Sequence, residues 1–189
     1  DGTEKFSGAH VSGGSPGNVT KKTATEGDEA ETAFYIGSLF AEKELNDNFA
    51  VGLDFVPMSM DSETTENVQK QMGSDKTNKV DVTFENMITA YVMLKADTGV
   101  YAKLGYIEVD VATNENLGTG GAYPDTTLEG IVAGVGYNHD MDTGMFVRIE
   151  GNLMDFGDVT VKNTADSTKS ITASGIEGYG AKISIGKSF

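Results

Sequence analysis

The sequence predicts an all-β protein, an eight-stranded antiparallel up-and-down barrel. Three observations lead to this fold class. Apolar and polar residues alternate with a period of two over most of the chain, which is the pattern of β-strands with one buried face. Helix-favouring patches are too short to form a stable helix. The connections between the expected strands alternate between long and short. The 189 residues fit a single domain, 1–189.

Eight segments show the alternation and are bounded by turn-forming residues. The expected strands are Lys5–Ser12, Thr32–Leu45, Phe49–Met60, Lys79–Ala96, Val100–Val111, Thr127–Asn138, Met145–Val161 and Ile171–Phe189. Eight is an even number, as closure of a bacterial barrel requires. The pattern leaves two registers open. Strand Thr32–Leu45 can be placed with either face inward, and Val100–Val111 switches face near Gly105.

The connections differ in length in a regular order. Short turns rich in Asn, Asp and Gly tolerate the positive φ of hairpins; they are Asn46–Asn48, Asp97–Gly99 and His139–Gly144. Long polar connections lie between them: Gly13–Glu31, Asp61–Asn78, Ala112–Thr126 and Lys162–Ser170. In an up-and-down barrel this order puts every long loop at one end. That arrangement is typical of barrels that cross an outer membrane, with short turns in the periplasm and long loops outside.

Composition excludes several classes of function. The net charge of −15 argues against a nucleic-acid partner, which needs basic patches. The absence of Cys excludes disulfides and thiol-ligated metals. A membrane helix needs about 20 consecutive apolar residues, and the sequence contains no such run. We expect no cofactor and no metal. Asp140 and Asp142 could bind Ca²⁺ weakly, but a hydrogen-bonded turn is the favoured interpretation.

The polar faces of the strands suggest what fills the interior. They are rich in Gly, Ser, Thr and Ala, and small residues suit the crowded lumen of an eight-stranded barrel. Opposite charges on these faces fall at similar depths and could pair there. The expected lumen charge network is Asp54, Glu85, Lys103, Arg148, Glu150 and Lys182. Phe146 and Phe156 share a face with Arg148, which does not fit a lipid-facing aromatic belt. A water-soluble ligand-binding barrel would reverse the two faces.

The last eleven residues carry a specific motif. Tyr179, Ala181, Ile183, Ile185 and Phe189 alternate with small or polar residues up to a terminal Phe. This resembles the final strand of outer-membrane barrel proteins, in which the motif is the signal for the barrel-assembly machinery. Lys187 departs from the pattern, because an apolar residue is usual there. The resemblance implies that the barrel-assembly signal consists of Tyr179, Ile183, Ile185 and Phe189.

The full-length layout is similar to the outer membrane protein A-like, opacity-like porin superfamily. Phe6–Gly14 looks like the opening strand of such barrels. The resemblance implies a Gram-negative outer membrane, with lipid, lipopolysaccharide and the assembly machinery as partners. The expected role is structural or surface interaction, with a surface ligand or self-association through the loops. A narrow channel is the alternative. A lipid A-modifying enzyme using His10 with Ser7 or Ser12 is less favoured, because no acidic partner can be assigned.

Overall fold

The computed structural model describes residues 2–6, 35–62, 65–69, 76–117, 121–165, 167 and 169–188. Its regular elements are all β-strands. They are β1 (Gly2–Phe6), β2 (Leu39–Asn46), β3 (Phe49–Val56), β4 (Met60–Asp61), β5 (Thr65–Gln69), β6 (Lys76–Lys95), β7 (Val100–Leu117), β8 (Thr126–Asp140), β9 (Met145–Phe156), β10 (Val159–Lys162), β11 (Lys169–Ala173) and β12 (Ile176–Lys187). Within the described ranges, no helix is long and apolar enough to cross a membrane.

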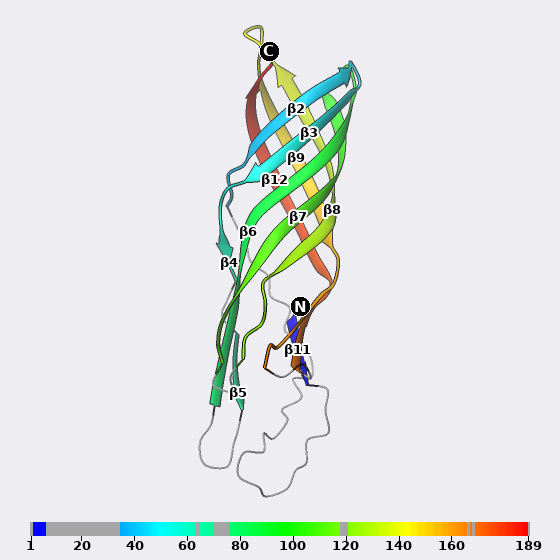
Figure 1. Cartoon of the computed structure of the whole chain (residues 1–189). Helices are drawn as coiled ribbons and strands as arrows, with labels where there is room; N and C mark the ends of the chain where they lie inside the picture. The colour runs from blue at the N-terminus through cyan, green and yellow to red at the C-terminus, as the bar shows by residue number, and fades with distance from the viewer. Residues whose placement is uncertain are drawn as a thin grey trace, which may run out of the picture.

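The main sheet has the order β12-β9-β8-β7-β6-β3-β2, and every pair in it is antiparallel. Short turns join the consecutive strands at one end, where the C-terminus also lies, and long strand extensions reach the other end (Figure 1). We call these the turn end and the loop end. The structure therefore confirms the expected all-β, antiparallel, up-and-down architecture.

The sheet curls round on itself. Four strands separate β2 from β9 in the sheet order. Even so, the rings of Phe40 on β2 and Phe146 on β9 lie 6.1 Å apart. Side chains from strands that are remote in the sheet thus meet on one inner face.

The curled sheet is not closed into the expected eight-stranded barrel. Among the described residues, no strand pairing joins β2 to β12. The expected first strand, Lys5–Ser12, is described only at Lys5 and Phe6, which belong to β1. β1 pairs with β11 and, through β11, with β10 in a separate three-stranded sheet. The main path therefore contains seven strands instead of eight.

Several strands extend further toward the loop end than the sequence predicts. β6 begins at Lys76 and β7 runs to Leu117, so both enter segments expected to be loops. β5 also lies in the expected loop 61–78, and β4 joins the last residue of the expected strand Phe49–Met60 to the first residue of that loop; both pair with β6. The pairing between β6 and β7 extends into this region and ends with Asn78 opposite Leu117.

A β-bulge on β6 changes which side chains face inward. The pairing of β6 with β7 shifts between Glu85 and Ile88. Asn86 has a φ of 51°, and its side-chain amide donates a hydrogen bond to Asp110 at 3.1 Å. A short polar residue tolerates this left-handed conformation. Because a bulge adds one residue to one strand, the alternation changes phase there. In β7, burial alternates regularly through Gly105, so the expected switch of face occurs on β6 instead.

The two faces of the sheet differ in chemistry. The buried side chains of the inner face include charged residues near the turn end, whereas the outer face carries large exposed apolar side chains. Those more than half exposed include Leu39, Leu45, Leu53, Val92, Leu94, Val100, Leu104, Ile131, Val135, Ile149, Leu153, Tyr179, Ile183 and Ile185. Soluble proteins rarely expose apolar surface so extensively.

Candidate functional site: a charged cluster on the inner face

Arg148 on β9 lies at the centre of the charged inner face. Its Nη1 donates to Oε1 of Glu42 at 2.5 Å, and its Nη2 donates to Oε2 at 2.9 Å. This bidentate pair joins β9 to β2 across the interior and fixes the guanidinium plane. Arg148 is 7% exposed. Neighbouring polar groups complete the pair. The hydroxyl of Tyr91 on β6 donates to Glu42 at 2.7 Å, and Arg148 Nε donates to Asn138 Oδ1 at 3.3 Å.

A second ion pair lies beside the first. Lys103 on β7 pairs with Glu150 on β9, and both side chains are almost fully buried. The Tyr101 hydroxyl donates to Glu150 Oε2 at 2.7 Å, and the Asn152 amide donates to Oε1 at 2.9 Å. Glu150 therefore accepts three hydrogen bonds, which offset its loss of water. We call Glu42, Tyr91, Tyr101, Lys103, Arg148 and Glu150 the charged cluster.

Aromatic rings surround the guanidinium. The Arg148 Cζ atom lies 5.0 Å from the ring centroids of both Tyr101 and Phe146, and 5.7 Å from that of Phe40. A cation this close to ring faces is stabilised by their quadrupoles. This contact explains why Phe146 shares a face with Arg148 in the sequence: its ring packs inside the sheet, and no lipid-facing position is needed for it.

Glycines make room for these rings. A Cβ atom added at Gly52 would collide with the ring of Tyr91, and one at Gly186 would collide with the ring of Phe146. The inner face therefore alternates large and absent side chains between neighbouring strands. This is the packing that a narrow, filled interior requires.

Two further ion pairs extend the charges along the inner face. Lys182 on β12 pairs with Asp54 on β3, and the Lys182 ammonium also lies 5.5 Å from the Phe40 ring centroid. Nearer the turn end, Lys95 pairs with Glu44, whose side chain is 70% exposed. An exposed pair of this kind contributes little to stability.

The inner face becomes apolar toward the loop end. Val109, Val111 and Leu128 are nearly fully buried there and form one cluster. Partly buried side chains pack against them: Val82, Phe84, Met87, Phe156, Val159 and Ile176. We call these nine residues the apolar cluster. Phe156, which shares the sequence phase of Arg148, belongs to it.

The structure brings five of the six expected network residues to the inner face. They form three pairs: Asp54 with Lys182, Lys103 with Glu150, and Arg148 with a residue that the sequence did not identify, Glu42. Glu85 is not brought into the network. It is exposed and faces Asp110 in the ladder, because the bulge at Asn86 puts it on the outer face.

The alternation of residues in β2 contains a signal for Glu42. In β2, Phe40, Glu42 and Glu44 alternate with Leu39, Ala41 and Lys43. Lys43 breaks the apolar side of that alternation, which is why either face of the strand could be placed inward. In the structure, Lys43 is exposed on the outer face close to the turn that follows β2.

The residues of the expected assembly signal lie on the outer face of β12. Tyr179, Ile183 and Ile185 are 81%, 76% and 67% exposed. Phe189 lies outside the described residues, as do His10, Ser7 and Ser12.

The hairpin turn between β8 and β9 contains Asp140 and Asp142, the two acids that could bind Ca²⁺ weakly. The Asn138 amide donates to Asp140 at 2.9 Å, Gly144 adopts a φ of 76°, and the Met141 N–H donates to the Met145 carbonyl at 2.8 Å. These bonds belong to an ordinary hairpin turn. Within the described ranges, no group of three or more His, Cys, Asp or Glu side chains is arranged to bind a metal ion.

The fold and the cluster together describe an all-β antiparallel sheet with a charged inner face and an apolar outer face. Comparison of the chain with protein-family models, curated proteins and solved structures finds no match.

Proposed function

We propose that the chain is a Gram-negative outer-membrane β-barrel protein whose interior is sealed and whose role is structural and surface-interacting. One observation carries this proposal: the outer face of the main sheet exposes large apolar side chains on every strand. In water, such a surface is unfavourable. In lipid, an apolar outer face with a polar interior is the expected polarity of a barrel.

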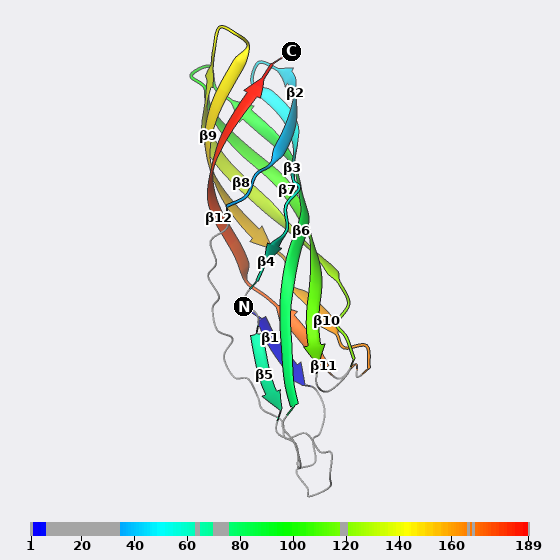
Figure 2. The ribbon, with the colours of Figure 1, turned by 90° about the vertical axis from the view of Figure 1, so that its left-hand side faces the viewer.

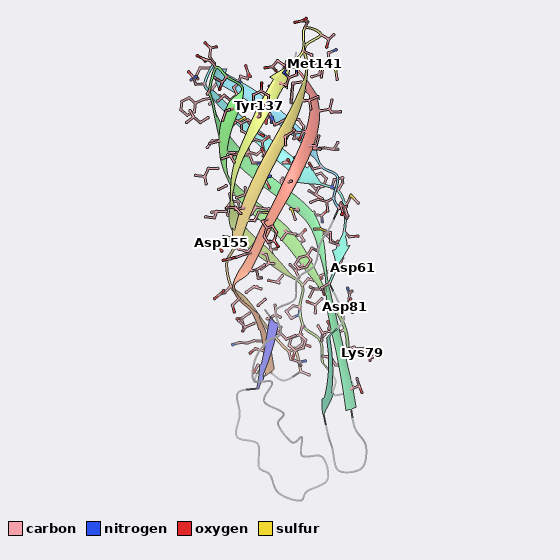
Figure 3. The ribbon with its side chains drawn as sticks, turned by 180° about the vertical axis from the view of Figure 1, so that it is seen from behind. Asp61, Lys79, Asp81, Tyr137, Met141 and Asp155 are labelled. Atoms are coloured by element: carbon pink, nitrogen blue, oxygen red, sulfur yellow. The ribbon has the colours of Figure 1, made fainter. Side chains whose placement is uncertain are left out.

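The borders of the apolar band support a bilayer position. Phe49 and Tyr137 lie on the outer face near the turn end, and Tyr106 and Tyr179 lie further toward the loop end; all four are substantially exposed. Aromatic side chains favour the two interfaces of a membrane. Beyond the second border, the outer face carries exposed carboxylates, including Glu129, Asp155 and Glu177. Figure 3 shows Tyr137 near the turn end and Asp155 further toward the loop end.

The filled interior favours a structural role over conduction. In the charged cluster each carboxylate is paired with a cation, and rings pack around Arg148. An ion entering from water would have to separate a buried pair, which costs several kcal/mol. A narrow channel remains the second candidate, because the same charges line the inner face and would attract ions if they rearranged.

The loop end is the expected site of surface interaction. β6 has 20 residues and β7 has 18, well beyond the 9–11 that cross a bilayer, so both project past the apolar band. The projecting strands would present a ligand-binding or self-association surface outside the cell. Lipopolysaccharide would surround the band, and the pattern of Tyr179, Ile183 and Ile185 would serve recognition by the assembly machinery.

The first experiment is folding into lipid vesicles, followed by electrophoresis with and without boiling. We expect a folded band that changes mobility on heating. The variant Leu153→Asp, in the middle of the apolar band, should lose this band, because a charge facing hydrocarbon is costly. The matched control Asp155→Asn, two residues along the same face, should keep it. A chain that stays in solution without detergent would contradict the proposal.

Planar-bilayer recording separates the two candidate functions. The account predicts no channel openings for the native chain. Steady openings that disappear in the double variant Arg148→Met, Glu42→Gln would instead establish conduction through the charged interior and remove the sealed-interior role.

A further inference from the structure

The two edges of the main sheet have the same direction. β2 ends at Asn46 and β12 ends at Lys187, and Figures 1 and 2 show both strands running toward the turn end. Neither edge is paired with another described strand along its length. In an antiparallel sheet, two edges of the same direction can be joined only by an odd number of inserted strands, of which the first and the last run the other way.

Side chains from the two edge strands meet on the inner face. Lys182 on β12 contacts the ring of Phe40 on β2 and pairs with Asp54 on β3. The edges are therefore within side-chain reach of each other. One inserted strand needs two inter-strand spacings, about 10 Å. A single strand running from the turn end to the loop end has the direction that both edges require.

β1 has the required direction and lies beside the required edge. It pairs antiparallel with β11, which directly precedes β12, and its register runs from Gly2 opposite Ala173 to Phe6 opposite Lys169. The chain thus runs toward the loop end as it leaves Gly2 (Figure 2). Traced backward from Gly2, the same ladder leads toward the start of β12.

The register continues from β11 into β12 without a shift. On their other side, Ala173 pairs with Val159, and Ile176 pairs with Phe156. Ala173 and Ile176 are three residues apart, and so are their partners Val159 and Phe156, so the intervening Gly175 inserts no extra residue relative to that neighbour. Ile176 and Lys187 lie three and fourteen residues beyond Ala173, so their partners on the first strand would lie about three to fourteen residues ahead of Gly2.

We propose that the unpaired edges of β12 and β2 are the binding site for one β-strand, and that the polypeptide directly upstream of Gly2 supplies it. The strand pairs with β12 on one side and β2 on the other and closes the barrel. β1 is its projecting end, paired with β11 beyond the apolar band. The inference does not depend on lipid, because strand pairing at these edges is independent of the solvent around the outer face.

The geometry also specifies the sequence pattern of this strand. Directly paired residues of neighbouring strands share a face. Ala181, Ile183 and Ile185 face outward, so their partners, eight, ten and twelve residues ahead of Gly2, are apolar. Lys182 and Ser184 face the interior, so their partners, nine and eleven residues ahead, are small or polar.

The first test is the intact mass and N-terminal sequence of the mature protein purified from the cells that make it. The result expected is a chain that begins at least fourteen residues ahead of Gly2 and shows this alternation. A mature protein that begins at Asp1 would overturn the proposal.

The second test measures pairing directly, in detergent micelles. A fourteen-residue extension with apolar residues at the even positions ahead of Gly2 is compared with one of equal composition shifted by one position. The first should raise the midpoint temperature for loss of the folded band by several degrees, and the shifted one should not. A cysteine ten residues ahead of Gly2 should form a disulfide with Ile183→Cys.

Other occupants of the edge give different products in the same experiment. Disulfide-linked dimers through Ile183→Cys would indicate a second copy of the chain at β12. A disulfide between Ile183→Cys and Lys43→Cys would indicate that β2 closes directly on β12. Either product in place of the expected disulfide would overturn the proposal. Because no lipid is present, failure here is distinguishable from failure of membrane insertion.

Discussion

The charged cluster and the apolar cluster lie on the same inner face, but different interactions stabilise their buried side chains. Near the turn end, bidentate and hydrogen-bonded ion pairs fill the interior. Near the loop end, Val109, Val111 and Leu128 pack with other apolar side chains. Buried ion pairs give geometric specificity at little net gain in stability, whereas apolar packing stabilises directly. The comparison suggests that the charged cluster fixes which strands meet across the interior, and that the apolar cluster holds the projecting strands together.

Along the same direction, the outer face changes in the opposite sense, from apolar to charged. It is apolar beside the charged cluster and acidic beyond it, where Glu129, Asp155 and Glu177 are exposed. Where the surroundings are proposed to be lipid, the interior is charged; where they are proposed to be water, the interior is apolar. The projecting part of the sheet therefore has the polarity of an ordinary soluble β-structure.

The largest effect is expected from breaking the charged cluster on one side only. Arg148→Met leaves the Glu42 carboxylate buried without its cation, which should lower the free energy of unfolding by about 3–5 kcal/mol. Adding Glu42→Gln should recover more than half of this loss, because the charge is gone and the amide oxygen still accepts from Tyr91. Urea unfolding in vesicles measures both. Equal stability of Arg148→Met and the native chain would show that the pair does not form.

A deletion in the apolar cluster should cost somewhat less. Leu128→Ala removes a side chain that is 3% exposed and should lower the free energy of unfolding by about 2–4 kcal/mol. Unlike the loss caused by Arg148→Met, this loss should not be recovered by a second substitution that removes a charge. The control Ile131→Ala, an outer-face residue of the same strand that is 56% exposed, should cost under about 1 kcal/mol in detergent. A reversed order would mean that the two faces of β8 have been exchanged.

Glycine substitutions test the packing of rings in the charged cluster. Gly52→Ala places a methyl group against the Tyr91 ring and should cost about 1–3 kcal/mol. Gly180→Ala, where a Cβ atom meets nothing within 4 Å, should change stability by less than about 0.5 kcal/mol. Chemical denaturation of the two variants side by side measures the two changes in the free energy of unfolding. If both are neutral, the ring of Tyr91 does not occupy the interior beside Gly52.

The smallest effect is expected at the bulge that separates the two regions. Asn86 has a left-handed backbone, so Asn86→Ala should cost about 1 kcal/mol, whereas Asn86→Gly should be neutral within about 0.5 kcal/mol. The same unfolding measurement compares the two. A larger loss in the Gly variant than in the Ala variant would contradict a left-handed backbone at this position, because both variants lose the hydrogen bond to Asp110 equally.

Alternation and turn chemistry were enough to predict the antiparallel order of the seven strands of the main sheet and five residues of the charge network. They could not predict Glu42, because Lys43 made the phase of its strand ambiguous. They misplaced Glu85, because a bulge at a single Asn changes the phase without a clear signal in the sequence. The predicted closure into an eight-stranded barrel is not found among the described residues: Lys5 and Phe6 of the expected first strand pair with β11, because the partner of a first strand depends on long-range register.

We propose that the outer face of the sheet contacts lipid up to a border and water beyond it. The most direct measurement uses a fluorophore on cysteine at Ile183 or at Glu177, two positions on the outer face of β12, in vesicles. We expect brominated lipid to quench the fluorophore at position 183, and aqueous iodide to quench the fluorophore at position 177. Quenching of both positions by iodide, with no effect of brominated lipid, would contradict the membrane assignment and make the apolar outer face an interface with protein.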